Sequence, residues 1–491
     1  MPRAIMRLQC DDDAVRSTGE RSFFMGFMDK ITALSGDWDG WIYSNILFWL
    51  LIIVGLYFSI KTKFVQIRLF PEGIRVLTEK SHEGGISSFQ ALMIATASRV
   101  GTGNIAGVAT AIVMGGPGAV FWMWLMAIIG SASAFIESTL AQIYKQPDGE
   151  IYKGGPAYYI ERALKARWLG VIFAILLILT FAFGFNGLQA YNIASAFETY
   201  AGDSYHLVAF IIGIVLAAIA AFLFFGGAHK ISTWSSVLVP IMAIIYIIVG
   251  LIITIANIGS LPSIFGMIFR EAFDFHTIFG GFAGSCMVWG VKRGLFSNEA
   301  GMGSAPNAAA SADVSHPVKQ GLVQVISVFI DTIIICSTTV FIILCTNIYE
   351  VGGDLNGIPL VQASVQSKFG SVGVAIITIS VALFAFTSLI GNYFYAEFNM
   401  KFISDKPKVM KTFKILAVIA VFIGANASLE IAWNVADILM AGMALVNCIA
   451  MLLLGNIACK ALKDYTDQKK AGKTPVFKAE NIGLDNTDVW K

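Results

Sequence analysis

Charged residues are scarce in this chain: Asp, Glu, Lys and Arg together make up 13% of its 491 residues. Hydrophobic residues make up 56%, and the mean hydropathy is +0.72. A soluble domain of this length needs a larger charged surface, so the composition excludes a soluble globular protein and indicates a polytopic membrane protein. The formal net charge is only +2 and the basic residues fall in short loops, which argues against nucleic acid as a partner.

Cysteine and histidine are also scarce, with six and five residues in the whole chain. The cysteines are scattered without a C-x-x-C pair, and cysteine and histidine do not cluster. This pattern excludes a disulfide framework and a zinc site. An intramembrane enzyme would need a nucleophile with a partner base or a set of metal ligands, and neither arrangement appears. We therefore expect that the protein is not an enzyme.

The N-terminal region differs in composition from the rest of the chain. Residues 1–24 are polar and mixed in charge, and they lack the apolar core of a cleavable signal peptide. Met25 and Met28 are plausible alternative starts. We interpret residues 1–40 as an N-terminal extension that is partly disordered.

Long apolar segments follow one another through the remainder of the chain. A helix needs roughly 20 residues to cross about 30 Å of hydrocarbon, and eleven segments come close to that length. The sequence thus predicts an all-α polytopic membrane protein with eleven transmembrane helices. The expected spans are about Trp41–Ile60, Ser88–Val113, Ala119–Tyr144, Trp168–Phe197, Leu207–Phe225, Trp234–Ala256, Ile278–Ala310, Gly321–Cys345, Val372–Lys401, Val409–Gly424 and Leu429–Ala458.

These spans divide into one additional helix and two sets of five. The initial N-terminal helix at 41–60 is followed by a first five-helix repeat at 88–256 and a second at 278–458. Because five is odd, the second set begins on the opposite side of the membrane, which gives inverted repeats. Residues 61–87 are basic, which favours a cytoplasmic linker at the membrane interface or a simple connecting loop.

Lysine and arginine collect in alternate connections, beginning with the one after the initial helix. The intervening loops contain few of them, and one has only Lys368. Since basic loops stay on the cytoplasmic side, the N-terminus is expected outside and residues 459–491 are expected to form a cytoplasmic tail. The expected location is the cell membrane, namely the bacterial inner membrane.

Two apolar segments carry an imperfect repeat of one motif. Residues 99–107 read RVGTGNIAG and residues 293–301 read RGLFSNEAG, so both share R-x4-N-x-A-G. The glycines and polar side chains predict that each helix is broken within the membrane, which is tolerated only where the freed backbone groups are buried in protein or line a watered cavity. Matching breaks in the first helix of each repeat indicate a transporter site. Glycine-mediated helix packing is the alternative.

The first break, at Gly101, Thr102, Gly103 and Asn104, is suited to binding an anion. Glycine lets the backbone unwind and brings its amides close to a ligand. The half-helix that restarts after the break presents free N–H groups and a positive dipole end at the middle of the membrane. A carboxylate is the expected ligand.

The second break, at 294–303, contains the ionisable residue Glu299 within an apolar span. Ionisable residues inside a membrane are rare and usually functional. Lys292 and Arg293 are expected to face an aqueous vestibule or to pair with Glu299. Alternatively, the helix ends near Trp289 and this stretch is a cytoplasmic loop.

Other polar residues within the apolar segments have two interpretations each. Thr387 and Ser388 offer adjacent hydroxyls that, with freed carbonyl groups, suit Na⁺ as a hard cation, or they bond back to their own helix. Gln189 and Asn192 share one helical face and either line a polar pathway or hold helices together. The lone carboxylates, which are either structural or ion ligands, are Glu137 and Asp331.

Residues 115–130, GGPGAVFWMWLMAIIG, resemble the signature of the alanine or glycine:cation (sodium) symporter family. The resemblance extends from about residue 41 to about residue 458. It implies a leucine-transporter-like fold of five plus five helices after one extra N-terminal helix, and amino-acid uptake driven by sodium. Further matching segments are GTGNIAG at 101–107, GGP at 154–156, WGVKRG at 289–294 and FSNEAG at 296–301.

The resemblance also implies roles for individual residues. The segment Gly101–Asn104 would receive the substrate carboxylate, and Gln189 would contact the substrate. Trp289 and the break after it would close the pocket from the other half. Thr387 and Ser388 match the hydroxyl pair of the sodium site that this fold shares.

Asn392 departs from the family pattern, because some members have a bulky tryptophan there that narrows the pocket. We expect a sodium-coupled symporter that imports a small neutral amino acid by alternating access, with alanine, glycine and glutamine as candidates. Na⁺ is the expected coupling ion, and no cofactor is expected. The other expected partner is the lipid bilayer. The sequence shows no sign of a nucleic-acid or protein partner. A proton-coupled carrier using Glu137 or Asp331 is the nearest alternative, and a channel lacks a ring-forming selectivity sequence.

Overall fold

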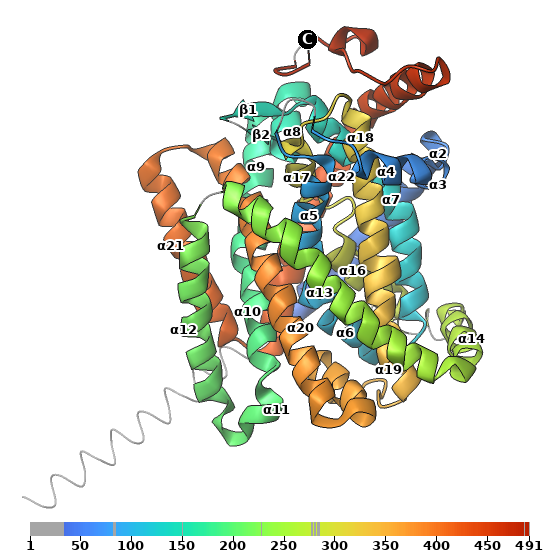
Figure 1. Cartoon of the computed structure of the whole chain (residues 1–491), viewed down its shortest axis with the longest axis vertical. Helices are drawn as coiled ribbons and strands as arrows, with labels where there is room; N and C mark the ends of the chain where they lie inside the picture. Colours follow the sequence, from blue (N-terminus) through green and yellow to red (C-terminus); the bar gives the residue numbers. More distant parts are fainter. Residues whose placement is uncertain are drawn as a thin grey trace, which may run out of the picture.

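Apolar helices stand side by side in the computed structural model and form one bundle (Figure 1). The structure describes residues 34–81, 85–149, 151–226, 228–275, 278, 281, 285–485 and 487–490. The structure is 81% helical, and seven helical stretches among its described residues are long and apolar enough to cross a membrane. The predicted all-α, multi-pass class is therefore confirmed. Most of the predicted N-terminal extension, residues 1–33, lies outside the described residues.

The long helices follow the order of the predicted spans, and many of their limits agree within a few residues. In chain order they are α2 (Phe48–Lys61), preceded by η1 (Tyr43–Leu47), α5 (Ser88–Arg99), α6 (Ala106–Gly115), α7 (Ala119–Ile143), α9 (Arg167–Ile178), η3 (Leu179–Phe185), α10 (Asn186–Ser195), α12 (Tyr205–Phe224), α13 (Ala228–Ala256), α16 (Cys286–Asn298), α17 (Pro306–Ser311), α18 (Pro317–Val328), η7 (Phe329–Cys336), α19 (Ser337–Thr346), α20 (Gly357–Ile403), α21 (Pro407–Ala425) and α22 (Leu429–Lys470).

Shorter elements connect these helices. They are α3 (Val65–Arg68), α4 (Phe70–Leu77), the 3-10 turn η2 (Thr102–Asn104), the antiparallel hairpin of β1 (Gln146–Asp148) and β2 (Ile151–Lys153), α8 (Pro156–Leu164), α11 (Glu198–Ala201), η4 (Gly202–Ser204), η5 (Ile258–Ser260), α14 (Leu261–Ala272) and η8 (Ala479–Ile482).

The first predicted break is confirmed. Helix α5 begins with a capping box, in which Ser87 and Gln90 satisfy each other's backbone amides, and it ends at Arg99. The backbone then leaves helical geometry at Val100 (φ −79°, ψ 83°) and forms η2 before α6 begins at Ala106.

The second predicted break is also confirmed. Helix α16 ends at Asn298 because Glu299 adopts the left-handed conformation (φ 54°), and α17 begins only at Pro306. The alternative interpretation, in which the helix ends near Trp289, is wrong. Residues 294–305 are buried, so the break lies inside the bundle.

Several helices differ from their predicted limits. Helix α20 begins at Gly357 and bends at Gly370 (φ 59°, ψ −148°), whereas the sequence predicted a start near Val372. Helix α22 continues beyond Ala458 to Lys470, into the segment predicted as a tail. The initial helix is already helical at Leu34, where the description begins.

The linker after the initial helix forms two short helices, α3 and α4. Proline at position 71 starts α4, where its missing N–H is unneeded. Val65 and Val76 are fully buried, and the ring of Phe70 lies 5.0 Å from that of Phe329 in η7. The linker therefore lies against the side of the bundle.

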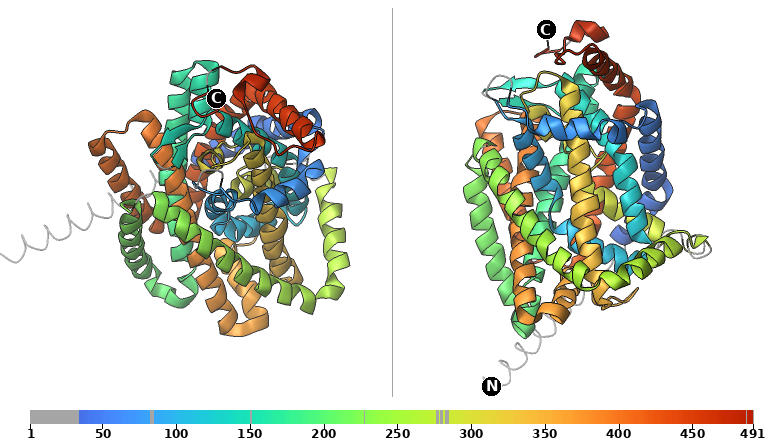
Figure 2. Two further views of the ribbon diagram at one scale, coloured as in Figure 1. Left: turned by 45° about the horizontal axis from the view of Figure 1, so that its top comes forward. Right: turned by 45° about the vertical axis from the view of Figure 1, so that its right-hand side comes forward.

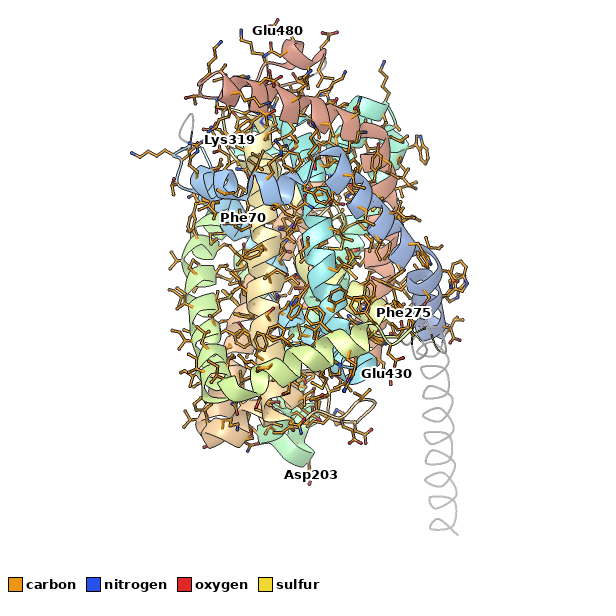
Figure 3. All side chains as sticks on the ribbon, turned by 90° about the vertical axis from the view of Figure 1, so that its right-hand side faces the viewer. Phe70, Asp203, Phe275, Lys319, Glu430 and Glu480 are labelled. Atoms are coloured by element: carbon orange, nitrogen blue, oxygen red, sulfur yellow. The ribbon has the colours of Figure 1, made fainter. Side chains whose placement is uncertain are left out.

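The bundle has two distinct ends. Lys319 and Glu480 lie at one end, and Asp203 and Glu430 lie at the opposite end (Figure 3). The C-terminal part of α22 crosses the Lys319 end (Figure 2). The segment after it is anchored by Trp490, whose ring N–H donates to the carbonyl of Gln142 (2.7 Å).

Candidate functional site

The two breaks contact each other in the middle of the bundle. The side-chain amide of Asn104 in η2 donates to the hydroxyl of Ser297 in α16 (3.0 Å). The same amide donates to Oδ1 of Asp331 (2.7 Å), and the carbonyl of Asn104 accepts from Thr339 (2.6 Å). The repeated asparagine therefore joins the first break to the second and to the η7–α19 helix.

Thr102 presents two donors to one acceptor from α10. Its backbone N–H and its hydroxyl both donate to Oε1 of Gln189, at 3.1 and 2.8 Å. The amide of Asn192 donates to the Thr102 hydroxyl (2.8 Å), and both α10 side chains are nearly fully buried. The predicted shared face of Gln189 and Asn192 thus meets the first break.

The glycines of the first break are required by close neighbours. A Cβ atom at Gly101 would collide with the Ser388 hydroxyl, and one at Gly103 would collide with the ring of Phe296. The backbone N–H of Gly101 donates to Oδ1 of Asn104 (3.0 Å). Without side chains at these positions, α20 and α16 can approach the unwound backbone.

The two predicted sodium ligands on α20 point to different neighbours. The hydroxyl of Ser388 donates to the carbonyl of Ser98 (3.3 Å), next to the first break. The hydroxyl of Thr387 donates to the carbonyl of Phe384 one turn earlier (2.9 Å) and lies 3.3 Å from the sulfur of Met242 in α13. In this conformation Ser388 faces the break, and Thr387 is bonded to its own helix.

Asn392 belongs to a buried polar network. Its Oδ1 accepts from the Ser98 hydroxyl (2.8 Å), and its Nδ2 donates to Oδ1 of Asn186 (3.1 Å). The Ser98 hydroxyl also lies 2.9 Å from Oε1 of Glu299, and Ser304 donates to Oε2 of Glu299 (2.6 Å). Ser98 and Ser304 were not predicted as site residues, because single serines are common in apolar segments.

Trp289 lies apart from the other predicted site residues. It lines a cavity of about 360 Å³ together with Lys292, Arg293 and Trp433. At the first break the second half contributes Phe296 instead, two turns further along α16. Lys292 and Arg293 therefore line a cavity, as one of the two interpretations of these residues predicted.

The predicted pairing of Lys292 and Arg293 with Glu299 is wrong. Lys292 forms ion pairs with Asp39 of the initial helix and with Asp437 of α22 (2.8 Å to the latter). Arg293 forms a bidentate pair with Asp437, at 2.7 and 3.2 Å. Glu299 follows the last residue of α16 and contacts the hydroxyls of Ser98 and Ser304 instead.

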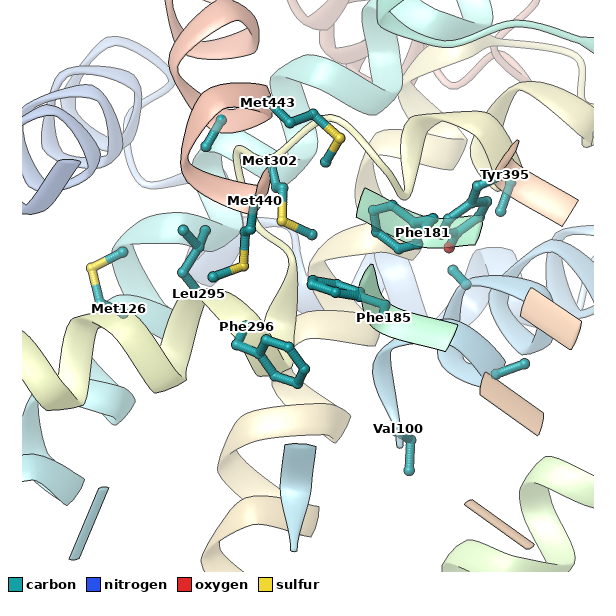
Figure 4. Packing of buried hydrophobic residues seen from close by; sticks show 14 of the residues in the cluster. Val100, Met126, Phe181, Phe185, Leu295, Phe296, Met302, Tyr395, Met440 and Met443 are labelled. Carbon is teal, nitrogen blue, oxygen red and sulfur yellow. The ribbon is translucent and has the colours of Figure 1, made fainter. Parts of the chain in front are cut away.

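Aromatic rings separate this cavity from the breaks. The ring of Phe296 lies 4.9 Å from that of Trp433 and 4.7 Å from that of Phe185, and Arg293 covers the Trp433 ring at 4.0 Å. Figure 4 shows Phe185 and Phe296 side by side, with Val100 of the first break nearby. The site is closed toward the Asp203 end.

The site is also closed toward the Lys319 end. The backbone N–H of Asp313 donates to the carbonyl of Ile86 (2.8 Å), which joins the start of α5 to the chain after α17. The carbonyl of Ala312 accepts from Gln142 and Lys145, both at 2.9 Å. In the described residues, contacts between segments therefore close the region of the breaks toward both ends.

The two lone carboxylates differ in their partners. Glu137 of α7 accepts from the backbone N–H of Gly301 (3.2 Å) and from the amide of Asn447 (2.7 Å), so it stabilises the second break. Asp331 accepts from Asn104 and from the hydroxyl of Ser297 (2.5 Å). Each acid therefore contacts a break.

A family model for sodium:alanine symporters matches residues 28–479. The chain belongs to the sodium:alanine symporter family. It is 47% identical over 447 residues to the amino-acid carrier protein AlsT of Bacillus subtilis (strain 168), which covers 91% of this chain and 95% of AlsT. It is 46% identical over 439 residues to the probable sodium/glutamine symporter GlnT of the same organism, with coverages of 89% and 91%.

A third relative is less similar in sequence. The sodium/alanine symporter AgcS of Methanococcus maripaludis is 38% identical over 434 residues, covering 86% of this chain and 94% of AgcS. Among solved structures, MhsT in complex with L-phenylalanine superposes with a TM-score of 0.54 at 12% identity, covering 82% of this chain and 92% of MhsT. This likeness shows that the chain has the leucine-transporter fold.

Proposed function

We propose that this chain imports a small neutral amino acid together with Na⁺ by alternating access. The observation that carries the proposal is the pair of donors on Thr102, which hold one amide oxygen of Gln189 at the first break. A substrate carboxylate offers the same kind of acceptor with a full negative charge, and a helix N-terminus favours such a charge. Binding would therefore displace Oε1 of Gln189 and place the carboxylate on the Gly101–Asn104 backbone.

The position of Ser388 supports a sodium site next to this carboxylate. Its hydroxyl lies against both the Gly101 backbone and the Ser98 carbonyl. Na⁺ would be held by the Ser388 and Thr387 hydroxyls and by carbonyl groups of the unwound segment. For this, the Thr387 side chain would turn about χ1, so that its hydroxyl oxygen leaves the Phe384 carbonyl.

The residues that select the side chain of the substrate would lie on the far side of the carboxylate site. Asn392, Phe185 and Phe296 surround that region, and Trp289 would act further out, in the cavity that precedes it. Relatives are named both for alanine and for glutamine, so alanine, glycine and glutamine are the substrates that we propose to compare.

We further propose eleven transmembrane helices, arranged as one extra helix and a five-plus-five inverted repeat. The two helix breaks, each in the first helix of its set, support the repeat. Lys319, Lys145 and the basic end of α22 lie at the same end of the bundle, which supports a cytoplasmic assignment for that end and an external one for the Asp203 end. For a bacterial cell we propose the inner membrane as its location.

Uptake of labelled amino acids into proteoliposomes tests the function. We expect alanine, glycine or glutamine to accumulate when Na⁺ is higher outside, and to stop accumulating when the sodium gradient is removed by an ionophore. Accumulation that ignores Na⁺ would reject sodium coupling. A failure to accumulate any of the three would reject the substrate class.

A further inference from the structure

Glu299 is a buried carboxylate without a cation of its own. Its side chain is 1% exposed at the end of α16, and among the described residues it takes part in no ion pair. Its two partners are the hydroxyls of Ser98 and Ser304. An ionised carboxylate in such surroundings costs several kcal/mol unless it is paired.

The charges around Glu299 do not balance. One buried cation, Arg99 of α5, lies among three buried acids, namely Glu137, Glu299 and Asp331. Arg99 donates to the neutral side chain of Gln324 (3.0 Å) rather than to any of these acids. Tyr395 of α20 is a further titratable group near Glu299. With one positive charge for three carboxyl groups, this region must hold protons or other cations in the closed conformation.

Hydrogen-bond partners distinguish Glu299 from the other two acids. Glu137 receives a backbone N–H and an amide N–H, and Asp331 receives an amide and hydroxyls. Amide hydrogens are fixed donors and favour the ionised acid. Glu299 has only hydroxyl partners, and a hydroxyl can rotate from donor to acceptor. Of the three acids, Glu299 is therefore the one whose surroundings accommodate a proton.

The number of hydrogen atoms available around Ser98 also indicates that Glu299 is protonated. The Ser98 hydroxyl has one hydrogen but two acceptors within bonding distance, Oε1 of Glu299 and Oδ1 of Asn392. If Glu299 is protonated, it donates to Ser98, Ser98 donates to Asn392, and Asn392 donates to Asn186. If the oxygen and nitrogen atoms of the Asn392 and Asn186 amides are exchanged, Asn392 donates to Ser98 and Ser98 is free to donate to Glu299. The negative charge of Glu299 would still be unpaired in that arrangement.

We propose that Glu299 is a proton-binding site of the transport cycle, protonated while the two breaks are closed on each other and deprotonated when they separate. Ser98 belongs to α5 and Glu299 to the link between α16 and α17, so opening either side moves them apart. Separation exposes the carboxyl group to water, and the proton passes to that water. The proposal rests on the proposed transport function for its place in the cycle, but not for the protonation itself.

Infrared spectroscopy of the purified full chain tests the protonation directly. Glu299→Gln keeps the size of the side chain and gives Ser98 an N–H donor in place of the carboxyl proton. We expect the parent-minus-E299Q difference spectrum at neutral pH to contain the carbonyl band of a protonated carboxyl group. A difference spectrum with a carboxylate band alone would overturn the proposal. This result does not depend on transport.

The pH dependence of sodium-driven uptake tests the role in the cycle. From mildly acidic to mildly alkaline pH we expect at least a roughly threefold change in parent uptake and a flat profile for E299Q. Glu480→Gln makes the same chemical change at an exposed position of η8 and should keep the parent profile. A pH-independent parent, or an E299Q profile like that of the parent, would overturn the role. An altered sodium requirement with an unchanged pH profile would show a Na⁺ site instead.

A measurement on the parent alone covers the case in which E299Q does not fold. A pH-sensitive dye trapped in the proteoliposomes should report proton movement that begins with amino-acid addition and requires Na⁺. Uptake without any proton movement would contradict the proposal. Absence of uptake would reject the proposed function, and the infrared result would still decide the state of Glu299.

Discussion

The amide oxygen of Gln189 occupies the two donors that Thr102 offers at the first helix break, its backbone N–H (3.1 Å) and its hydroxyl (2.8 Å). Both donors are buried at the N-terminus of η2, where the first backbone N–H has no acceptor within the turn, and buried donors need a partner. A side chain that satisfies them in the closed conformation keeps the break intact until a substrate replaces it. Gln189 thus links the stability of the site to its occupancy.

The first prediction concerns this relationship. Replacing Gln189 with Glu puts a negative charge on the Thr102 donors, which strengthens the internal contact and repels a substrate carboxylate. We expect uptake at subsaturating substrate to fall at least about tenfold, equivalent to about 1.4 kcal/mol. Gln366→Glu makes the same chemical change at an exposed position of α20 and should leave uptake unchanged. Equal uptake by Q189E and the parent would mean that the carboxylate binds elsewhere.

The second prediction separates the two hydroxyls of the proposed sodium site. Ser388 already faces the break, whereas Thr387 bonds to Phe384. We expect Ser388→Ala to raise the Na⁺ concentration for half-maximal uptake by about tenfold or more, and Thr387→Ala to raise it less. Ser380→Ala serves as the control, because Ser380 lies about two turns before Ser388 and its hydroxyl donates to the Ile376 carbonyl of the same helix. An unchanged sodium requirement in S388A would reject the site.

Local sequence features were enough to predict the breaks but not their distant partners. The glycines and asparagine of 101–104 disfavour a continuous helix wherever they are placed, so the interruption could be predicted without knowledge of the fold. The partners of Lys292 were not predictable in this way, because Asp39 and Asp437 are far from it in sequence. A nearby acid, Glu299, was the obvious candidate and was wrong.

Trp289 lies too early in α16 to reach the first break. The sequence placed this residue in the correct helix, but the break occurs at Asn298, about two and a half turns later at 3.6 residues per turn. The side chain that reaches the first break is therefore Phe296. Only the exact end of α16, set by the left-handed Glu299, could have distinguished the two aromatic residues.

The third prediction concerns orientation. Asn426 directly follows the end of α21, and Lys470 is the last residue of α22. Both residues are exposed. A cysteine introduced at Asn426 should react with an impermeant thiol reagent in intact cells, and a cysteine at Lys470 should react only after lysis. Most native cysteines are buried, which keeps the background low. The opposite pattern would invert the topology and remove the basis of the repeat assignment.

The fourth prediction concerns acid stability at the Lys319 end. Glu72 of α4 accepts hydrogen bonds from Arg75, from Tyr465 (2.6 Å) and from Lys469 (3.2 Å), which fastens the extension of α22 to the linker. The hydrogen bonds from Arg75 lower the pKa of Glu72 from 4.5 to about 2.

Because the folded pKa lies below the ordinary value, Glu72 stabilises the fold above about pH 4.5, and this contribution is lost as the pH falls toward about 2. We expect Glu72→Gln to lower the melting temperature at neutral pH. We also expect the melting temperature of this variant to fall less than that of the parent as the pH is lowered. Glu480→Gln, at an exposed glutamate of η8, is the matched control. A melting curve for E72Q that follows the parent at every pH would show that this cluster contributes nothing.

The fifth prediction concerns substrate choice at Asn392. The side chain is 1% exposed and bonds to Ser98 and Asn186, so an indole there both adds bulk and removes two hydrogen bonds. Steric exclusion acts most strongly on large ligands, and we expect Asn392→Trp to reduce uptake of glutamine while sparing alanine and glycine. Asn392→Ala removes the same bonds without adding bulk.

The measurement is competition of labelled uptake by unlabelled alanine, glycine and glutamine in all three proteins. If N392W and N392A change together, the hydrogen bonds matter and the bulk does not. If N392W ranks the competitors as the parent does, the side-chain pocket lies elsewhere, and Phe185 and Phe296 become the next positions to vary.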